Sequence, residues 1–158
     1  MFRELARKKQ QLSDAECIGL LKSTKRGILS VLGDGGYPYG VPHNHYYHEA
    51  DGKLYFHSGM HGHKIDAIRA CSKASYCVMD EGTPEENGWA LNFRSVIVFG
   101  RIEIVEDPER AIGLCRLLSY QFTHDEDYIA HEIRTAGPRT LVFALVPEHI
   151  TGKRVNEK

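Results

Sequence analysis

The strongest structural signal in this chain lies in residues 53–70, KLYFHSGMHGHKIDAIRA. The apolar first part of this segment, which ends at His57 and Ser58, predicts a buried strand. Gly59 and Gly62 bracket a tight turn, and the residues after the turn predict a short helix. A strand, a glycine turn and a helix are therefore expected in direct succession.

Lys64 falls in the first turn of that helix, where Ile65 and Ile68 would face a core. A cation is usually unfavourable there, because the N-terminus of a helix already carries partial positive charge. A bound phosphate would explain it, since free backbone N–H groups, the Ser58 hydroxyl and the Lys64 ammonium would converge on one anion. The alternative is a solvated lysine beside an ordinary turn, because the spacing is not that of a Walker motif.

The composition predicts one domain, residues 1–158, with a core of its own. Lys plus Arg (20) nearly balances Asp plus Glu (21), which argues against a nucleic-acid partner. No apolar stretch approaches the roughly 20 residues that span a membrane, and the basic N-terminal segment has no apolar region typical of a signal peptide. Reduced thiols in a cytoplasmic protein are expected, since the four cysteines show no C-x-x-C spacing: Cys17, Cys71, Cys77 and Cys115.

The rest of the chain predicts a mainly β (α+β) protein, a six-stranded antiparallel barrel with peripheral helices. A hairpin turn is expected at residues 33–36, GDGG, because glycine and aspartate favour such turns. Pro38 and Pro42 interrupt the following strand, which is therefore expected to be bulged or partly unpaired. The expected strands are 27–32, 37–48, 53–58, 74–80, about 89–105 and 139–147.

Three helix starts can be read from capping residues. Ser13 and Glu16 form a capping box that opens a helix running to about residue 22. Asp107 followed by Pro108 predicts a helix to about residue 120. A further helix is expected over 126–134, with Thr123 as its cap.

The order of three segments resembles that of the pyridoxamine 5'-phosphate oxidase-like flavoproteins. They are YPYGVPHNHYYHEADGKLYFHSGMHGHKIDAI (37–68), FRSVIVFGRIEIVED (93–107) and, after a closing strand, HITGKR (149–154). Within that superfamily the chain is most similar to the nitroimidazole-resistance (NimA-type) branch, and the block from Tyr55 to Asp66 is the most specific part of the match. The resemblance implies a split β-barrel that binds FMN at a homodimer interface.

The resemblance also implies roles for individual residues. Ser58 and Lys64, with His63 beside them, would hold the FMN phosphate. His57, the expected catalytic residue, would face the ribityl chain or the ring edge next to Phe56. The remaining expected cofactor-binding residues are Val41, Pro42, His43 and Asn44 alongside the flavin ring, and Arg94 and Ser95 reaching it from the other subunit.

Histidines gather in one window, at positions 43, 45, 48, 57, 61 and 63. Imidazole is a common metal ligand, but the spacing matches no known zinc motif, and no metal is expected. Haem is an alternative cofactor, with His57 or His61 as its ligand. For His45 and His48 a role as polar edge residues is expected.

These expectations combine into an FMN-dependent oxidoreductase that reduces small electron-poor organic molecules, such as nitroimidazoles, with NAD(P)H as donor. His43 or Arg94 could supply a cation that stabilises the reduced flavin. No Rossmann motif is present, so the nicotinamide donor would visit an open flavin face. The alternatives are a non-catalytic flavin- or haem-binding protein and a pyridoxamine 5'-phosphate oxidase-like enzyme.

Two further features have structural interpretations. Trp89 and Phe93 are expected to be core or dimer-interface anchors, because large aromatic side chains dominate buried interfaces. The basic residues 151–154 follow the expected last strand and are taken to be solvated.

Overall fold

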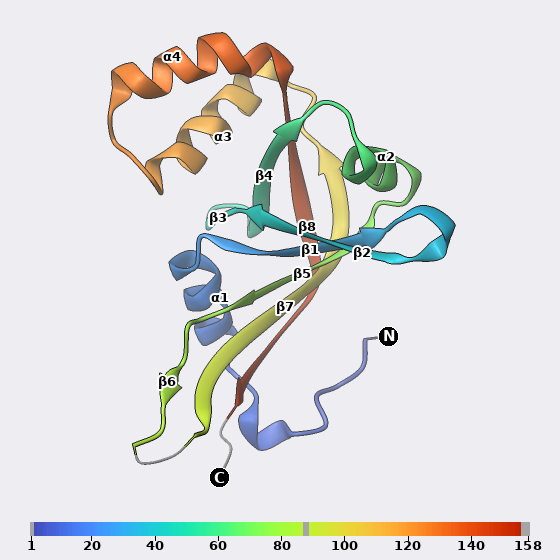
Figure 1. Cartoon of the computed structure of the whole chain (residues 1–158), viewed down its shortest axis with the longest axis vertical. Coiled ribbons are helices and arrows are strands. Elements are labelled where there is room, and N and C mark those ends of the chain that lie inside the picture. Colours follow the sequence, from blue (N-terminus) through green and yellow to red (C-terminus); the bar gives the residue numbers. More distant parts are fainter. Residues whose placement is uncertain (1, 87–88, 156–158) are drawn as a thin grey trace.

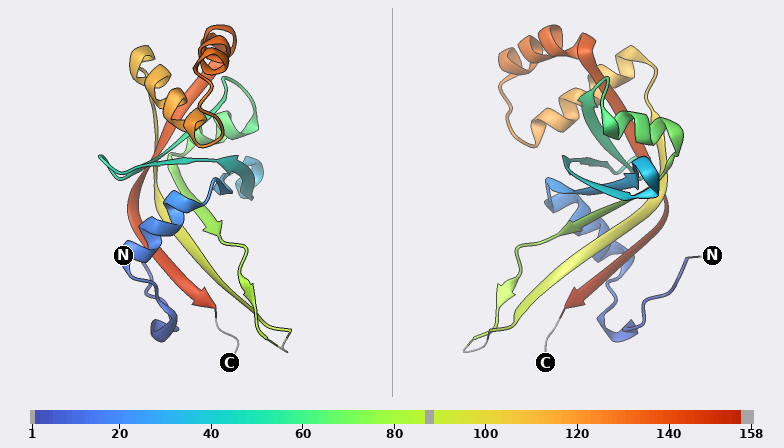
Figure 2. Two further views of the ribbon diagram at one scale, coloured as in Figure 1. Left: turned by 90° about the vertical axis from the view of Figure 1, so that its left-hand side faces the viewer. Right: turned by 45° about the vertical axis from the view of Figure 1, so that its right-hand side comes forward.

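The computed structural model describes residues 2–86 and 89–155, and its main feature is one strongly curled antiparallel sheet (Figures 1 and 2). The strand order is β2-β1-β5-β7-β8-β4-β3, and β6 pairs with β7 beside this path. The sheet wraps into a half-barrel, so the split-barrel prediction is confirmed. The strands are β1 (Arg26–Leu32), β2 (Pro38–Asn44), β3 (Tyr46–His48), β4 (Lys53–Gly59), β5 (Lys73–Met79), β6 (Thr83–Pro84), β7 (Leu91–Ile104) and β8 (Thr140–Val155).

The strand count differs from the predicted six. The 37–48 segment forms two strands, because His45 leaves the sheet between β2 and β3, and the short β6 adds another. β8 continues far beyond residue 147 and pairs with β7 as far as Val155. The expectation of a solvated tail at 151–154 is therefore wrong: Gly152 is buried and lies opposite Val96.

β2 is more regular than its two prolines suggest. Its register with β1 runs without a shift from Arg26 opposite Asn44 to Leu32 opposite Pro38, so the predicted bulge is absent from this pair. The strand tolerates both prolines because it lies at the edge of the sheet and has no second neighbour that needs their missing N–H groups.

In the described part of the chain, four α-helices flank the sheet: α1 (Asp14–Ser23), α2 (His63–Ala70), α3 (Pro108–Tyr120) and α4 (Glu126–Ala136). The capping box of Ser13 and the Asp107 cap are confirmed. The cap of α4 is Asp125, not Thr123. The Asp125 carboxylate accepts the Tyr128 N–H at 3.0 Å, whereas the Thr123 hydroxyl accepts the N–H of Asp125 itself, which lies before the helix.

The main core fills the inside of the curl, where buried apolar side chains of the sheet meet α1 and α2. Ile65 and Ile68 of α2 belong to it, as the sequence predicted. A smaller core lies between α3 and the outside of β4 and β8, around Tyr55 and Val142. Trp89 is 93% exposed, so it is not a core residue of the single chain. Among the described helices none is long and apolar enough to cross a membrane.

Candidate functional site

A cavity of about 620 Å³ opens between β2, at one end of the strand order, and the end of β4. One wall comes from β1 and β2, and the other comes from the end of β4, the short turn at Gly137–Arg139 and the start of β8. Its lining residues are Arg26, Pro42, His43, Asn44, His57, Ser58, Gly59, Lys64, Ala136, Arg139 and Thr140.

The contact between Lys64 and His43 joins the α2 side of the cavity to β2. Lys64 Nζ lies 2.9 Å from His43 Nε2. An ammonium can only donate, so Nε2 accepts and the ring proton lies on Nδ1. Nδ1 then donates to the backbone oxygen of Asn44 at 3.0 Å, which fixes the ring orientation.

This arrangement keeps His43 neutral. Burial lowers the pKa of His43 from 6.5 to about 4, and the nearby Lys64 charge acts in the same direction. Burial also lowers the pKa of Lys64. The expectation that His43 could act as a cation is therefore wrong at neutral pH, and Lys64 provides the positive charge at this point.

The turn before α2 places Lys64 next to the end of β4. Gly62, the N-cap of α2, has φ +119°, a conformation that favours glycine, and no side chain caps the helix. The first turn therefore leaves backbone N–H groups without a side-chain partner, and Ser58 and Lys64 line the same cavity. Ser58 and Gly59 pair with Leu141 and Thr140, so β8 begins at the same corner.

His57 lies at the mouth of the cavity and is exposed in the single chain. Its partial desolvation and the Lys64 charge lower its pKa. The imidazole is thus neutral at pH 7, with one nitrogen that can donate and one that can accept. No hydrogen bond to another described residue restrains it.

Two other expected cofactor contacts do not reach the cavity with their side chains. Phe56 is fully buried in the main core, where its ring stacks on Phe143 at a centroid distance of 5.2 Å. Successive side chains of a strand alternate between faces, so Phe56 points away from the side used by His57. The Phe56 and His43 rings meet edge to face with their centroids 5.3 Å apart, so Phe56 packs against a side chain that lines the cavity. Val41 is half-buried and does not line the cavity.

His63 also points elsewhere. Its ring stacks on Tyr39 at 4.2 Å, and its Nε2 accepts the Asp34 N–H at 3.3 Å. The side chain therefore joins α2 to the β1–β2 turn. Of His63, only the backbone N–H is left to contact the expected phosphate.

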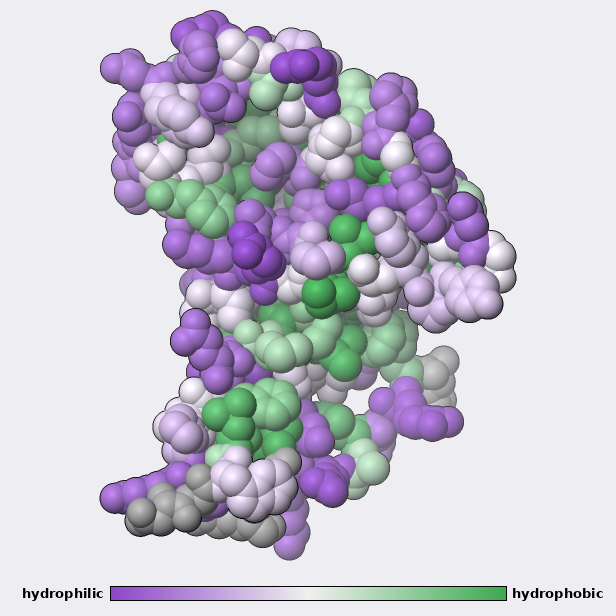
Figure 3. All heavy atoms as spheres, viewed as in Figure 1, coloured by the Kyte–Doolittle hydropathy of each residue, from purple (hydrophilic) through white to green (hydrophobic). Residues whose placement is uncertain are grey.

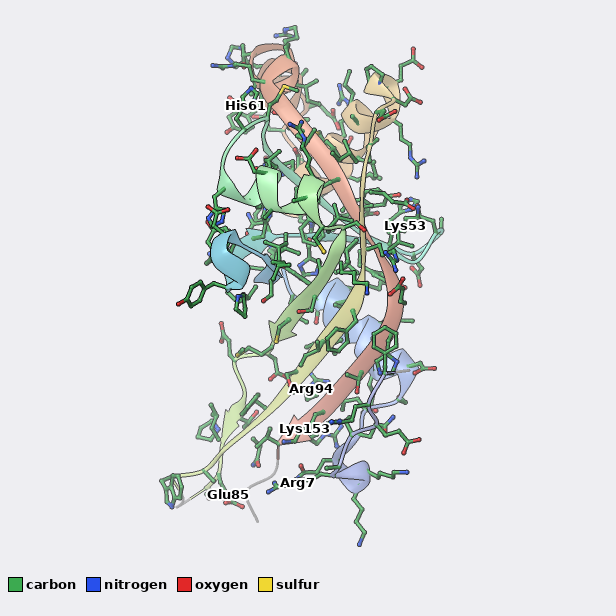
Figure 4. The ribbon with its side chains drawn as sticks, turned by 90° about the vertical axis from the view of Figure 1, so that its right-hand side faces the viewer. Arg7, Lys53, His61, Glu85, Arg94 and Lys153 are labelled. Carbon is green, nitrogen blue, oxygen red and sulfur yellow. The ribbon has the colours of Figure 1, made fainter. Side chains whose placement is uncertain are left out.

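Arg94 and Ser95 lie far from the cavity within the same chain. Figure 4 shows Arg94 well down the sheet from His61, which lies two residues before the start of α2. The Arg94 side chain is engaged with Asp80, with Nε donating to Oδ2 at 2.8 Å. Any contact of these two residues with a cofactor would have to come from another subunit, as the sequence analysis expected.

Sequence reasoning missed five cavity residues: Gly59 and Ala136, and three with polar side chains, Arg26, Arg139 and Thr140. Arg26 could have been found, because a hairpin turn at 33–36 with a regular register places it opposite Asn44. The other two polar residues depend on the pairing of β4 with β8, which are about 80 residues apart in the sequence and are joined by no short turn.

The histidine window separates into residues with different roles. His45 is fully buried, against expectation, and its ring lies between the Leu21 backbone oxygen at 2.8 Å and the Tyr76 hydroxyl at 2.9 Å. These two contacts hold the chain in place where it passes from β2 to β3. His48 lies 3.0 Å from Asp51 at the other end of β3. In the described part of the chain, no cluster of three or more His, Cys, Asp or Glu side chains has a metal-binding arrangement.

The sequence profile of the pyridoxamine 5'-phosphate oxidase family matches residues 13–154. The chain therefore belongs to the pyridoxamine 5'-phosphate oxidase family. It has no sequence match among curated proteins.

Solved structures with the same fold include several from bacteria. A candidate 5-nitroimidazole antibiotic resistance protein from Bacteroides thetaiotaomicron has a TM-score of 0.75 at 19% identity, over 91% of this chain and 86% of that chain. A conserved hypothetical protein from Mycobacterium tuberculosis has a TM-score of 0.79 at 17% identity, over 96% and 90%. An FAD-binding protein from Mesorhizobium loti has a TM-score of 0.65 at 26% identity, over 93% and 98%.

Proposed function

We propose that this protein binds FMN in the cavity and is an oxidoreductase of small electron-poor organic molecules, such as nitroimidazoles, with NAD(P)H as donor. The observation that carries the proposal is the setting of Lys64. This lysine is half-buried in the first turn of α2, lines the same cavity as Ser58, and its ammonium has a neutral histidine as partner in place of a carboxylate. Its positive charge is therefore available for an anion.

The residues present fit a flavin phosphate. Ser58 offers a hydroxyl, Lys64 an ammonium, and the first turn of α2 offers backbone N–H groups. The cavity also extends from this corner along Pro42, His43 and Asn44, which leaves room for the remainder of a mononucleotide. Among the proteins of similar structure, those from Mesorhizobium loti and Mycobacterium smegmatis are FAD-binding proteins, which supports a flavin as the ligand class.

When bound, the flavin would supply the transfer of electrons between the nicotinamide donor and the acceptor. The protein would contribute position and charge. Lys64 would hold the anionic end, and the neutral His57 at the mouth would exchange a hydrogen bond or a proton with a molecule that enters.

We also propose that the protein is a homodimer whose interface borders this cavity. Ile28, Cys77 and Ile97 lie in one row across β1, β5 and β7, on the same face of the sheet. Ile28 and Ile97 are 38% and 37% exposed, and Figure 3 shows apolar side chains gathered over the middle of the surface seen there. Ile28 lies opposite Pro42, which lines the cavity, so a second copy on this face would extend its wall.

The proposed function is tested in two steps. Mass spectrometry identifies the small molecule released when freshly purified protein is denatured, and FMN is expected. Anaerobic titration with NADH or NADPH, followed by a nitroimidazole or a quinone, then checks turnover. Reduction of the bound flavin and its reoxidation by the acceptor are expected. A colourless protein that takes up no added FMN, or a haem spectrum, would overturn the proposal.

A further inference from the structure

The cavity is more positive than one phosphate requires. Among the residues that the structure describes, three cationic side chains line it, Arg26, Lys64 and Arg139, and no Asp or Glu does. None of the ion pairs formed by the described residues includes any of the three. Cations without carboxylate partners around one cavity attract anionic ligands and raise their local concentration.

Two of these cations belong to the proposed phosphate corner. Lys64 lines the cavity together with Ser58, and Arg139 directly precedes Thr140, which pairs with Gly59. Together with the first turn of α2 they account for the terminal phosphate of a mononucleotide. Arg26 is not needed for that group.

Arg26 reaches the cavity from the opposite wall. It lies at the start of β1 opposite Asn44, and its Nε donates to Asn44 Oδ1 at 2.8 Å. This bond uses one side of the guanidinium, fixes its plane and leaves the two terminal nitrogens for another acceptor. A guanidinium held in this way suits a carboxylate or phosphate, which it can bind through two parallel hydrogen bonds.

We propose that Arg26, positioned by Asn44, binds an anionic group other than the terminal phosphate of the flavin, so that the site prefers ligands with a carboxylate or a second phosphate. The inference rests on the proposed function, because it places this group relative to a bound flavin. Two sources share the chemistry: an anionic donor or acceptor molecule, and the second phosphate of a dinucleotide flavin.

Binding titrations separate these sources. The flavin absorbance of FMN-loaded protein is followed during addition of 4-nitrobenzoate or the neutral 4-nitrobenzamide, which differ in charge at similar size. The benzoate is expected to bind roughly 10- to 150-fold more tightly, and Arg26→Gln to remove about that factor for the benzoate alone, since a charged hydrogen bond contributes about 1.5–3 kcal/mol. In the second arm, the dissociation constants of FMN and FAD are compared in both proteins. If Arg26→Gln weakens the binding of FAD but not that of FMN, Arg26 binds the second phosphate.

Two controls make the assignment specific. Arg26→Lys retains the charge and is expected to recover part of the preference for the benzoate. Arg69→Gln removes an exposed arginine from the last turn of α2, outside the cavity. It should change neither the preference for the benzoate nor the dissociation constants of FMN and FAD. The inference is overturned if Arg26→Gln binds FMN normally and both preferences are unchanged. If native protein binds no flavin, the proposed function fails first, and the inference fails with it.

Discussion

The Lys64 ammonium donates to Nε2 of His43 across a distance of 2.9 Å, and the same imidazole donates from Nδ1 to the Asn44 backbone. The pair therefore contains a single positive charge, located on the lysine and held at the cavity wall by a neutral ring. This relationship makes Lys64 a positioned cation, in contrast to a flexible surface lysine. It also joins α2 to β2, two elements that supply opposite parts of the site.

Acid should destabilise the protein through His43. Its pKa is about 4 in the folded chain, against 6.5 when exposed, so the unfolded state binds more protons between these values. The free energy of unfolding should therefore be intact at pH 7 and fall as the pH drops below about 6.5. The expected loss between pH 7 and 4.5 is on the order of 2 kcal/mol from this residue. Urea unfolding at the two pH values measures it.

His43→Gln provides the control for this pH effect. Glutamine can still accept from Lys64 through its side-chain oxygen, but it does not titrate. The variant should lose less stability than the native protein over the same pH range, by about the amount assigned to His43. Equal losses in the two proteins would show that other groups cause the acid sensitivity.

His57→Ala should impair turnover and leave FMN bound. The side chain lies at the mouth of the cavity and forms no hydrogen bond with another described residue, so its removal should not disturb the fold. A loss of about 100-fold or more in kcat is expected if the imidazole exchanges a proton with the acceptor. Steady-state kinetics and flavin fluorescence measure the two properties. His61→Ala, an exposed histidine outside the cavity, should behave like the native protein. Full turnover in His57→Ala would remove this residue from the mechanism.

Ile97→Asp should separate the proposed dimer. It puts a charge on β7, at the end of the exposed row formed by Ile28, Cys77 and Ile97, where a buried interface would have to desolvate it. Sedimentation is expected to show a monomer with weakened FMN retention, because the interface borders the cavity. Ile112→Asp, at an equally exposed isoleucine on α3, should leave both properties unchanged. A native protein that is monomeric with FMN bound would contradict the dimer directly.

Local features of the site could be predicted from the sequence. The strand end at Ser58, the glycine turn and the helix containing Lys64 are contiguous, so their relative positions follow from short-range geometry. The orientation of Ile65 and Ile68 follows from helical periodicity in the same way.

Long-range features could not be predicted. The position of Arg139 depends on which strand pairs with β4, and the burial of His45 depends on α1 and β5 closing over it. The inward direction of Phe56 follows from the alternation of β4, but only when the face of β4 that is buried is known. His63 points toward Tyr39 because α2 packs beside the β1–β2 turn, a contact between elements about 25 residues apart.

The dissociation constant of FMN for native protein and for Lys64→Ala tests the central claim most directly. Loss of a hydrogen bond to a charged group should weaken binding by about 1.5–3 kcal/mol, or roughly 10- to 150-fold, while Lys73→Ala, an exposed lysine on β5, should bind like the native protein. An unchanged FMN affinity in a folded Lys64→Ala protein would contradict the assignment of the phosphate to this corner.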